Sequence, residues 1–501
     1  MTEFNSILST FEVTCKRFPK KIALYCLEES LSYEALQDSV QQWSNAFFNE
    51  QLQGKRILIY LDKGIDYVKS IYACLATGAT YIPVDASQPL ERILSIIEQA
   101  KPDLIITDEN KNSTINNVLI SRFLINQSAC YFMKEDNKLV YLNNNKNSNR
   151  AFYTSKTDDV AAILFTSGST GVPKGVKVSH QNLSYFINWA VQSLNLTHKD
   201  VLSNHASFAF DLSTFDIFAA GQVGAATWII TSQQQQNVAE LINGIKKYSV
   251  TTWYSVPSVL SMMVATNALD MQVTKTLRHV LFAGEVYPIG ALRELKKCIA
   301  ETCSLQNWYG PTETNVCLYH KVTNDDLKKN YPVPIGKPLN GIDAVIDSDK
   351  PIGELIIYGA CVTPGYYNVQ DKRNNQLHKN KGHATGDLVR FENGYYYYQS
   401  RVDDMVKING HRIELGEIDA CLSVMPGVKA VAVLCITSDF QQKLTAFIVA
   451  KEESQINTLS VKQFVSERLP RYMVPNSVKC LLQLPKNANG KIDFKVLRGL
   501  A

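Results

Sequence analysis

The sequence carries almost no excess of charge of either sign. Of its 501 residues, 51 are Lys or Arg and 47 are Asp or Glu, which leaves a formal net charge of only +4. A protein that binds nucleic acid or an anionic membrane through its overall charge needs a marked basic excess. The composition therefore excludes general polyanion binding. We expect no nucleic-acid partner, no membrane partner, and binding of any ligand at a specific site.

Paired cysteines and long apolar runs are also lacking. The 11 cysteines are scattered and include no C-x-x-C pair, so buried reduced thiols are predicted instead of a disulfide scaffold. No apolar run approaches the roughly 20 residues that a membrane-spanning helix needs. The first residues are acidic and polar where a secretory signal has a basic stretch and an apolar core. We expect a soluble, cytoplasmic protein.

Short apolar runs alternate with helical patterns in the first part of the chain. Strands are predicted at Arg56–Leu61, Tyr81–Val84 and Asp103–Thr107. Helices are predicted between them, over Ile65–Gly78, where the glycine ends the helix, and over Pro89–Ala100. This alternation is typical of parallel sheets covered by helices and predicts an α/β fold.

The alternation continues over much of the remaining chain. It resumes at Ala161–Phe165 and runs again from Ala225 to Trp308. Tyr131–Asp159, which includes a polar run of mostly asparagine at residues 143–149, and the glutamine run Gln233–Gln236 are interpreted as polar connections.

The pattern changes near residue 400. Beyond it lie two apolar segments and a helix near Val461–Arg468, which are typical of a small α+β domain. A chain of this length also exceeds what one hydrophobic core usually serves. The sequence predicts a large N-terminal domain of helix-covered sheets, residues 1–400, and a small C-terminal domain, residues 401–501.

A glycine-rich loop follows one of the predicted strands, in the segment Ile163–Val176 (ILFTSGSTGVPKGV). Glycines let successive backbone N–H groups converge, hydroxyls add donors and a lysine supplies charge, which together suit a polyphosphate. Such loops are also common as flexible linkers, and no Gly-Lys-Ser/Thr triplet closes this one as in a Walker A loop. By itself the loop leaves both interpretations open.

Further motifs follow in order and decide between these interpretations. They are TSGSTGVPKG (166–175), NWYGPTE (307–313), ATGD (384–387), SRVDDMVKINGHRIELGEID (400–419), LPRYMVP (469–475) and NGKID (489–493). In this order the motifs resemble those of the adenylate-forming superfamily, which includes acyl-CoA synthetases, luciferases and the amino-acid adenylation domains of nonribosomal peptide synthesis. The resemblance implies that family's fold, with a mobile C-terminal domain.

The resemblance implies that a carboxylate attacks the α-phosphate of ATP, releases pyrophosphate and leaves an acyl-adenylate. Both reacting groups are anionic, so the site needs positive charge and fixed donors. The glycine-rich loop matches the family's phosphate contacts, and later motifs match its adenine and ribose contacts. The matching residues are Thr166, Ser167, Gly168, Ser169, Thr170, Gly171 and Lys174 in the loop, followed by Gly284, Glu285, Asn307, Tyr309, Gly310, Thr312, Asp387, Tyr398 and Arg401.

Three residues match catalytic positions of the family. Lys491 matches the lysine that bridges the substrate carboxylate and the α-phosphate, although a lysine in an exposed turn is most often a solvated surface charge. Glu313 matches the ligand of Mg²⁺, a hard cation that suits carboxylate and phosphate oxygens. Thr166 opens the phosphate-binding loop. ATP and Mg²⁺ are the implied cofactors.

The resemblance also implies that the small domain rotates before a thiol attacks the adenylate. Asp403 matches the hinge and Gly410 the thiol channel. The sequence departs from the family pattern at Ser400, where glycine is usual, and at Asn409, where arginine is commoner. HATGD also lacks the usual tyrosine and arginine ahead of Thr385.

Asp211, in the segment FDLS, distinguishes subfamilies. By position alone it could cap the N-terminus of the helix that follows. In amino-acid adenylation enzymes the aspartate of this motif pairs with the substrate's α-ammonium group, and fatty acyl-CoA synthetases and luciferases lack it. A buried cation left without a buried anion is strongly unfavourable. Asp211 therefore indicates an α-amino acid substrate.

The remaining positions of the amino-acid pocket, assigned by the same resemblance, carry no charge. Trp308 is large where many relatives have a small residue, which indicates a compact aliphatic substrate side chain. The set resembles most closely that of stand-alone prolyl-carrier-protein ligases, so L-proline is the predicted substrate and D-alanine the alternative. The pocket residues besides Asp211 are Leu212, Phe215, Ser255, Leu281, Ala283, Trp308, Val316 and Cys317.

The predicted acceptor is the phosphopantetheine thiol of a separate carrier protein, because no carrier motif follows Lys491 before the last residue, Ala501. Two other classes of function stay open. An acyl-CoA ligase would form a CoA thioester of a simple carboxylic acid. A nucleotide-binding protein without catalysis would keep the fold alone, against which the presence of Lys491, Glu313 and Asp387 argues.

Overall fold

The computed structural model describes residues 6–107, 130–132, 134–135, 138–139, 150–168, 172–368, 380–438, 441–451, 454, 456–485 and 492–500. The chain divides into two compact units. The first comprises Met1–Ser87, Ala100–Phe165 and Gly175–Ser400, and the second comprises Gln88–Gln99, Thr166–Lys174 and Arg401–Ala501. The domain division into residues 1–400 and 401–501 stays a prediction, and the two units are described separately.

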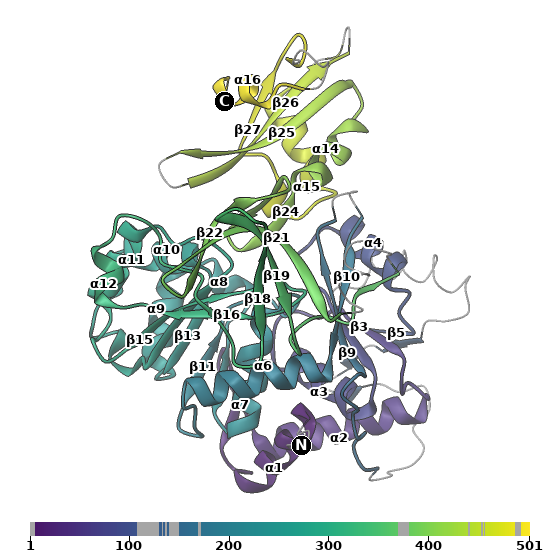
Figure 1. Cartoon of the computed structure of the whole chain (residues 1–501). Coiled ribbons are helices and arrows are strands. Elements are labelled where there is room, and N and C mark those ends of the chain that lie inside the picture. Colours follow the sequence, from purple (N-terminus) through teal and green to yellow (C-terminus); the bar gives the residue numbers. More distant parts are fainter. Residues whose placement is uncertain are drawn as a thin grey trace. The chain divides into compact units, whose positions relative to one another are not determined.

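The largest sheet of the first unit has nine strands within the described residues, in the order β17-β16-β15-β14-β13-β11-β12-β1-β2. Figure 1 labels four of them, β11, β13, β15 and β16. Its central strands are parallel, and antiparallel strands β2, β16 and β17 lie at the edges. The bounds are β1 (Ile22–Cys26), β2 (Glu29–Ser32), β11 (Val201–Asn204), β12 (Ala226–Ile229), β13 (Thr252–Ser255), β14 (His279–Ala283), β15 (Ser304–Tyr309), β16 (Leu318–Lys321) and β17 (Lys337–Pro338).

A second sheet has the order β20-β10-β9-β4-β3-β5-β6, and its pairs β3–β4, β3–β5, β4–β9 and β5–β6 are parallel. A third sheet has the order β18-β19-β21-β22. The strands are β3 (Arg56–Ile59), β4 (Thr80–Pro83), β5 (Leu104–Ile106), β6 (Cys130–Phe132), β9 (Val160–Thr166), β10 (Lys174–Ser179), β20 (Tyr366–Tyr367), β18 (Asp343–Asp347), β19 (Ile352–Tyr358), β21 (Gly382–Glu392) and β22 (Tyr395–Arg401), besides the hairpin β7 (Lys134–Glu135) and β8 (Lys138–Leu139).

Two apolar clusters form most of the core of the first unit. One joins both larger sheets through α1, α2, α3, α6 and α7, and the other packs α9, α10 and α11 against the nine-stranded sheet. Side chains along β14 alternate between them, with Leu281 in the first and Val280 and Phe282 in the second. The helices are α1 (Ile7–Arg17), α2 (Tyr33–Asn49), α3 (Ile65–Thr77), α6 (His180–Ser193), α7 (Leu212–Val223), α8 (Ser232–Gln235), α9 (Val238–Lys247), α10 (Pro257–Ala265), η3 (Thr274–Thr276), α11 (Ile289–Cys298) and α12 (Asn324–Lys328).

The second unit combines short helices with small sheets. β23 pairs with β24, and β25, β26 and β27 form a three-stranded sheet whose core includes side chains of α14 and α15. The elements are β23 (Met405–Ile408), β24 (His411–Glu414), α14 (Leu415–Ser423), β25 (Val428–Ser438), β26 (Gln441–Ala450), α15 (Thr458–Ser466), η4 (Arg471–Met473), β27 (Ser477–Cys480) and α16 (Phe494–Gly499), together with most of α4 (Leu90–Ala100).

The predicted α/β fold is confirmed, and most predicted elements agree with the structure. The helix predicted over Ile65–Gly78 is α3, and Gly78 caps it with a left-handed φ of 74°. Two connections differ from the prediction. Gln233–Gln236 overlaps the single-turn helix α8, which Thr231 and Gln234 stabilise by a reciprocal capping box. The segment Tyr131–Asp159 overlaps β6, β7 and β8, while residues 143–149 lie outside the described part.

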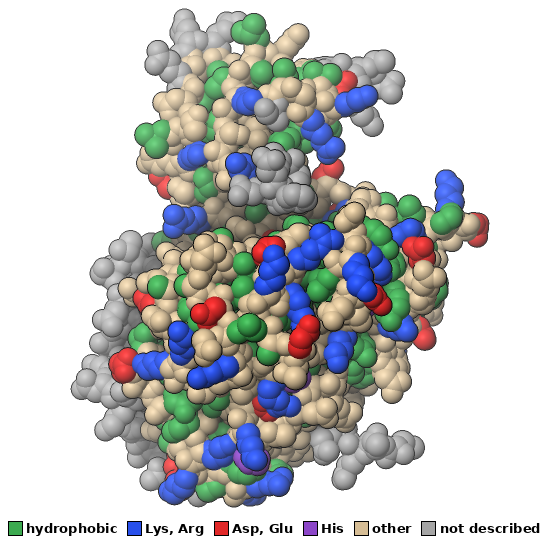
Figure 2. Space-filling model, turned by 90° about the vertical axis from the view of Figure 1, so that its left-hand side faces the viewer, with side chains coloured by type: hydrophobic (Ala, Val, Ile, Leu, Met, Phe, Trp, Pro, Cys, Tyr) green, Lys and Arg blue, Asp and Glu red, His purple; other side chains and the backbone are tan. Residues whose placement is uncertain are grey.

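Side-chain chemistry follows the composition. Basic and acidic side chains are interspersed on the face shown in Figure 2. Ten cysteines are free among the described residues; six are buried, three are partly buried, and Cys480 is exposed. Burial raises the pKa of Cys15 and of Cys303 to about 12, so these thiols stay protonated at neutral pH.

No helix in the described ranges combines the length and apolarity needed to cross a membrane.

The structure explains why asparagine stands at position 409. Strands β23 and β24 form a hairpin in which Ile408 pairs with His411, so Asn409 and Gly410 make a two-residue turn. Both have left-handed backbones, with φ of 51° and 76°. This is the conformation that Asn-Gly adopts most readily among short hairpin turns. Asparagine at position 409, in place of the commoner arginine, therefore favours the left-handed backbone that this turn requires.

Asp419 on α14 is expected to make the second unit less stable as the pH rises. Burial raises the pKa of its carboxyl to about 6, and the charge of Asp404 acts in the same direction. Because this lies above the ordinary value of 3.8, the fold favours the protonated form, and that stabilisation is lost as the pH rises through about 6. Asp419→Asn is expected to raise the free energy of unfolding by about 2 kcal/mol at pH 8, and much less near pH 4.

Calorimetric unfolding of the full chain at both pH values tests this expectation. The asparagine keeps the side-chain oxygen that accepts a hydrogen bond from the Val433 N–H, at 2.8 Å in the native protein. Asp349→Asn, at an exposed position of the first unit, is the matched control. A gain of the same size at pH 4 and pH 8 would contradict the assignment to the ionised carboxylate.

Candidate active site

A cavity in the first unit brings together residues from distant parts of the chain. Three of them, Asp211, Thr312 and Glu313, were predicted as site residues. Asp211 follows β11, and the other two follow β15, so they lie beyond the carboxyl ends of parallel strands in one sheet, where α/β folds bind ligands. The full lining is Tyr81, Ala162, Leu164, Lys177, Val178, Asn182, Asp211, Thr214, Thr312, Glu313, Asn315, Cys361 and Thr363.

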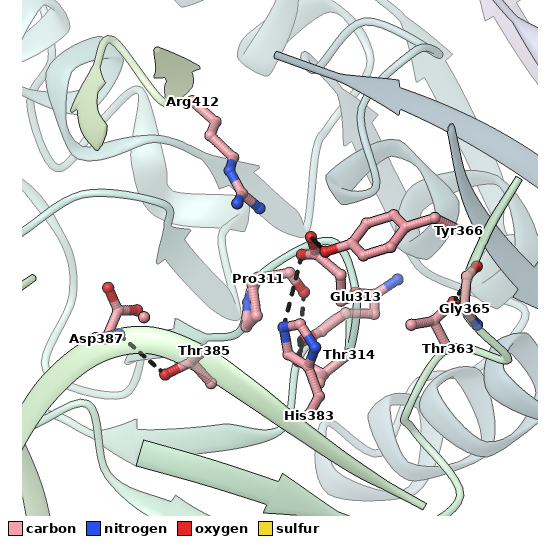
Figure 3. A network of polar contacts seen from close by, with 12 residues as sticks. Pro311, Glu313, Thr314, Thr363, Gly365, Tyr366, His383, Thr385, Asp387 and Arg412 are labelled. Carbon is pink, nitrogen blue, oxygen red and sulfur yellow. Dashed lines mark hydrogen bonds and ion pairs between the residues drawn. The ribbon is translucent and has the colours of Figure 1, made fainter. Parts of the chain in front are cut away.

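Glu313 lines this cavity, and Figure 3 shows it with its polar neighbours Tyr366 and His383. It is 2% exposed, and its Oε1 accepts a hydrogen bond from the Tyr366 hydroxyl at 2.7 Å. Nε2 of His383 lies 4.0 Å from Oε2, and the backbone N–H of Thr363 donates to the backbone oxygen of Glu313 at 2.8 Å. A preoriented carboxylate at a cavity wall fits the chemistry of a Mg²⁺ ligand that shares the ion with phosphate oxygens.

Asp387 and Tyr309 form a second polar pair in the first unit. The Tyr309 hydroxyl donates to Oδ2 of Asp387 at 2.5 Å. The backbone N–H of Asp387 donates to Thr385 Oγ1 at 3.1 Å, as Figure 3 shows. Burial, with a smaller effect from the Asp387 charge, raises the pKa of Tyr309 well above its ordinary value. The phenol therefore stays protonated and donates to a carboxylate whose position is fixed.

The other predicted nucleotide residues of the first unit have varied surroundings. Asn307 donates its side-chain N–H to the Pro334 backbone oxygen at 2.9 Å, so this donor already has a partner within the protein. Glu285 accepts a hydrogen bond from the Ser258 backbone N–H at 3.1 Å. Gly284 has a φ of 90°, which favours glycine. Tyr398 packs, partly buried, against an apolar cluster that includes Tyr309.

Asp211 does not use its carboxylate to cap a helix. It occupies the N-cap position of α7, yet its backbone is right-handed helical, with φ of −59° and ψ of −30°, and its side chain makes no capping hydrogen bond. Its backbone oxygen instead accepts hydrogen bonds from the N–H and the hydroxyl of Thr214, at 3.0 and 2.6 Å. The side chain, 8% exposed, lines the cavity. This geometry favours the pairing interpretation over the capping one.

The predicted side-chain pocket coincides with an aromatic cluster. The ring of Trp308 lies 5.1 Å from both Phe215 and Tyr254, edge to face, and 5.2 Å from Trp189. Of the predicted pocket residues, Phe215, Leu281, Ala283, Trp308 and Val316 belong to the first core cluster, and Leu212 packs against it.

Two predicted pocket residues have other surroundings. The Ser255 hydroxyl accepts a hydrogen bond from the Trp253 indole at 2.9 Å. Cys317 lies in the neighbouring cluster with Tyr309. Asp211 alone among the predicted pocket residues lines the cavity described above.

The glycine-rich loop belongs, in its described part, to the second unit. Thr166 ends β9, and Lys174 begins β10. The Ser167 hydroxyl donates to the Arg412 backbone oxygen at 2.6 Å. A Cβ at Gly168 would lie 2.0 Å from the Val172 backbone oxygen, so only glycine fits this turn. Ser169, Thr170 and Gly171 lie outside the described residues.

Other predicted residues of the second unit lie near its start and end. Arg401 forms two hydrogen bonds with Asp403, Nε to Oδ1 at 2.5 Å and an Nη to Oδ2 at 2.8 Å. This arrangement joins a residue predicted to bind ATP to the predicted hinge. Lys491 lies outside the described residues. Among the described residues after it, the backbone N–H of Asp493 donates to the Pro485 backbone oxygen at 2.8 Å.

Sequence reasoning missed several residues around Glu313 and Asp211. Thr214 and Asn315 line the cavity, and Tyr366 contacts the Glu313 carboxylate. Their residue types carry no signal of their own, although Asn315 lies two residues past the end of the NWYGPTE motif. The sequence did mark His383, because histidine stands there where the family usually has tyrosine. In the structure this histidine lies beside the carboxylate of Glu313.

Comparison with known families identifies the chain. The AMP-binding enzyme family matches residues 11–367, and the AMP-binding enzyme C-terminal domain matches residues 417–491. The chain belongs to the AMP-binding enzyme family. The family assignment agrees with the resemblance predicted from the motifs and with the α/β architecture.

Within this family the chain is similar to ligases of carrier proteins. It is 38% identical to an L-proline--[L-prolyl-carrier protein] ligase of Streptomyces coelicolor, over 89% of this chain and 87% of the relative. It is 34% identical to a protein of the same name from Pseudomonas fluorescens, over 95% of each chain. A D-alanine--D-alanyl carrier protein ligase of Bacillus cytotoxicus is 28% identical over 98% of each chain.

Solved structures share the fold of this AMP-binding enzyme. An adenylation domain of Vibrio cholerae in complex with glycyl-adenosine-5'-phosphate has a TM-score of 0.83 and 22% identity, covering 100% of this chain and 98% of that chain. A nonribosomal peptide synthetase protein containing adenylation and carrier domains has a TM-score of 0.82 and 21% identity, covering 98% of this chain and 84% of that chain.

Proposed function

We propose that this AMP-binding enzyme activates L-proline with ATP and transfers it to a carrier protein. A carboxylate oxygen of proline attacks the α-phosphorus of ATP, the bond to the β-phosphate oxygen breaks, and pyrophosphate leaves. The phosphopantetheine thiol then attacks the carbonyl carbon of prolyl-AMP, loses its proton, and releases AMP. The observation that carries this proposal is the Asp211 carboxylate, which lines the same cavity as Glu313 and caps no helix.

In this proposal Asp211 binds the secondary ammonium group of proline. A substrate cation inside a protein needs a nearby anion, since an unpaired buried charge is costly. The aromatic rings of Phe215, Tyr254 and Trp308 would bound the space for the side chain, and they offer no charged partner. A compact apolar ring such as that of proline suits these surroundings. Two relatives at 38% and 34% identity that are named L-proline--[L-prolyl-carrier protein] ligase support the same substrate.

Several of the residues matched by the resemblance would hold the nucleotide. Asp387, fixed by Tyr309, would accept hydrogen bonds from the ribose hydroxyls. The glycine-rich loop with Lys174 would bind the β- and γ-phosphates. Glu313 would hold Mg²⁺, which supplies positive charge to the phosphate oxygens when bound. Lys491 would bridge the carboxylate and the α-phosphate from a mobile lid domain of residues 401–501, with its hinge at Asp403 and Gly410 in the thiol channel.

Amino-acid-dependent ATP–pyrophosphate exchange tests the substrate. The full chain is assayed with Mg²⁺ and with each common L- and D-amino acid in turn. We expect the largest kcat/KM with L-proline, and transfer of the prolyl group to a phosphopantetheinylated carrier protein detected by mass spectrometry. If kcat/KM is highest with D-alanine, the proposed substrate is wrong and the proposed reaction still holds. Absence of exchange with every amino acid would overturn the proposed function itself.

A further inference from the structure

Asn315 connects the loop after β15 to the first turn of α7. Its Nδ2 donates to Oγ1 of Thr214 at 3.1 Å, and that hydroxyl donates in turn to the backbone oxygen of Asp211 at 2.6 Å. Hydrogen bonds in series polarise and strengthen one another. The side chain of Asn315 is therefore the start of a short hydrogen-bonded chain that ends at the residue proposed to bind the substrate ammonium group.

The orientation of the Asn315 amide is set by its surroundings. Oδ1 accepts a hydrogen bond from the Val316 N–H at 2.8 Å, which leaves Nδ2 as the atom that meets the Thr214 hydroxyl. The backbone of Asn315 has a φ of 50°, a conformation that asparagine tolerates better than most residues. Both features hold the amide in one direction.

The loop that carries Asn315 is also tightly folded. A Cβ at Gly310 would lie 1.6 Å from the Asn315 backbone oxygen, so only glycine permits this approach. The same backbone oxygen accepts a hydrogen bond from the Thr314 hydroxyl at 3.0 Å. Glu313 lies within this loop, so a displacement of Asn315 is transmitted to the proposed Mg²⁺ ligand only two residues away.

Both ends of the connection line one cavity. Asp211 and Thr214 contribute from α7, and Glu313 and Asn315 from the loop after β15. The hydrogen bond between Asn315 and Thr214 therefore spans the two elements that would hold the amino acid and the metal. A misplacement of reacting groups by about 1 Å can cost about 100-fold in rate.

We propose that Asn315 is a positioning residue that sets the distance between the amino-acid carboxylate and the α-phosphate. Through Thr214 it holds the first turn of α7, and through its own backbone it holds the Glu313 loop. Its side chain acts in this proposal through the hydroxyl of Thr214, and no catalytic step is assigned to it. This inference rests on the proposed function, because it needs Asp211 to bind the amino acid and Glu313 to bind Mg²⁺.

Two substitutions separate the amide from the backbone conformation. Asn315→Gly keeps the left-handed backbone and removes the amide, and Asn393→Gly is its matched control. Asn393 is an exposed residue of the turn between β21 and β22, with a φ of 52°. Thr214→Val removes the hydroxyl with little change in shape, and Thr214→Ser restores it.

The full chain and its variants are compared by pyrophosphate exchange and by thermal unfolding. We expect Asn315→Gly and Thr214→Val each to lower kcat about 10-fold to 100-fold, with the KM for ATP within about twofold of the native value. Asn393→Gly and Thr214→Ser are expected to stay close to native kcat. The double variant Asn315→Gly with Thr214→Val should be about as slow as the slower single variant, because both remove the same connection.

The outcomes distinguish this inference from the proposed function. A native protein that exchanges no pyrophosphate with any amino acid overturns the proposed function first. If the native protein is active and Asn315→Gly keeps its kcat, the positioning role is wrong. It is also wrong if the double variant loses the product of the two single losses, or if the loss of activity in Asn315→Gly is accounted for by unfolding at the assay temperature.

Discussion

Lys491→Ala is expected to slow proline-dependent pyrophosphate exchange by about 1000-fold and to leave the affinity for ATP within a few-fold of the native value. The carboxylate and the α-phosphate are both anionic, and loss of a preorganised donor or charge at such a centre costs about 100-fold to 1000-fold in rate. The loop and Asp387 would still bind the nucleotide. The rate of proline-dependent pyrophosphate exchange measures the loss of adenylation, and calorimetric titration with ATP measures the affinity.

A matched variant and a second substrate sharpen this test. Lys495→Ala removes an exposed lysine of α16, four residues farther along the same small domain, and is expected to be neutral. Synthetic prolyl-AMP bypasses the first step, so Lys491→Ala should still transfer proline from it to a carrier protein at close to the native rate. If Lys491→Ala lowers the rates of adenylation and of transfer equally, Lys491 has a structural role. If its exchange rate stays within about threefold of the native rate, Lys491 is not a catalytic residue.

Asp211→Asn is expected to raise the KM for L-proline by at least 100-fold, with the KM for ATP nearly unchanged. Removing one partner of a buried, hydrogen-bonded ion pair costs about 3–5 kcal/mol, which corresponds to a factor of more than 100 in affinity. The side chain lines the cavity and caps no helix, so its replacement removes no capping hydrogen bond. Pyrophosphate exchange over a range of proline concentrations measures the effect.

An oxygen analogue of proline separates amino-acid activation from acyl-CoA ligation. Tetrahydrofuran-2-carboxylate has the ring and the carboxylate of proline without its cation. The native enzyme should prefer proline strongly, and Asp211→Asn should lose that preference because the charge partner is gone. Asp349→Asn, at an exposed position of the same unit, should keep it. An acyl-CoA ligase would use the analogue as well as proline, would transfer it to CoA, and would be indifferent to Asp211.

Local sequence patterns were sufficient to predict secondary structure where the interactions that stabilise it involve residues close together in the sequence. The apolar run at Arg56–Leu61 is the buried strand β3, and α3 ends at Gly78 because glycine adopts the left-handed cap at no steric cost. Helix α8 escaped prediction because the capping pair Thr231 and Gln234 outweighs the polar character of the glutamine run. Short polar helices depend on such specific hydrogen bonds, which composition does not reveal.

The candidate site was predicted only in part, because its residues act through contacts across the chain. The motifs pointed to Asp211, Asp387 and Glu313, but only the structure showed that the Asp211 side chain makes no capping hydrogen bond. The partners Tyr366 and His383 meet Glu313 from 53 and 70 residues away in sequence. Nothing in their local sequence records that proximity.

By itself the sequence determined the family and the α/β class, because ordered motifs and short-range periodicity are properties of the chain. Only the tertiary structure decided which groups meet. It placed Asp211 and Glu313 in one cavity, paired Tyr309 with Asp387, and joined Asn315 to Thr214. These pairings depend on strand order in the sheets and on the packing of helices between them, which bring together residues that no local pattern relates.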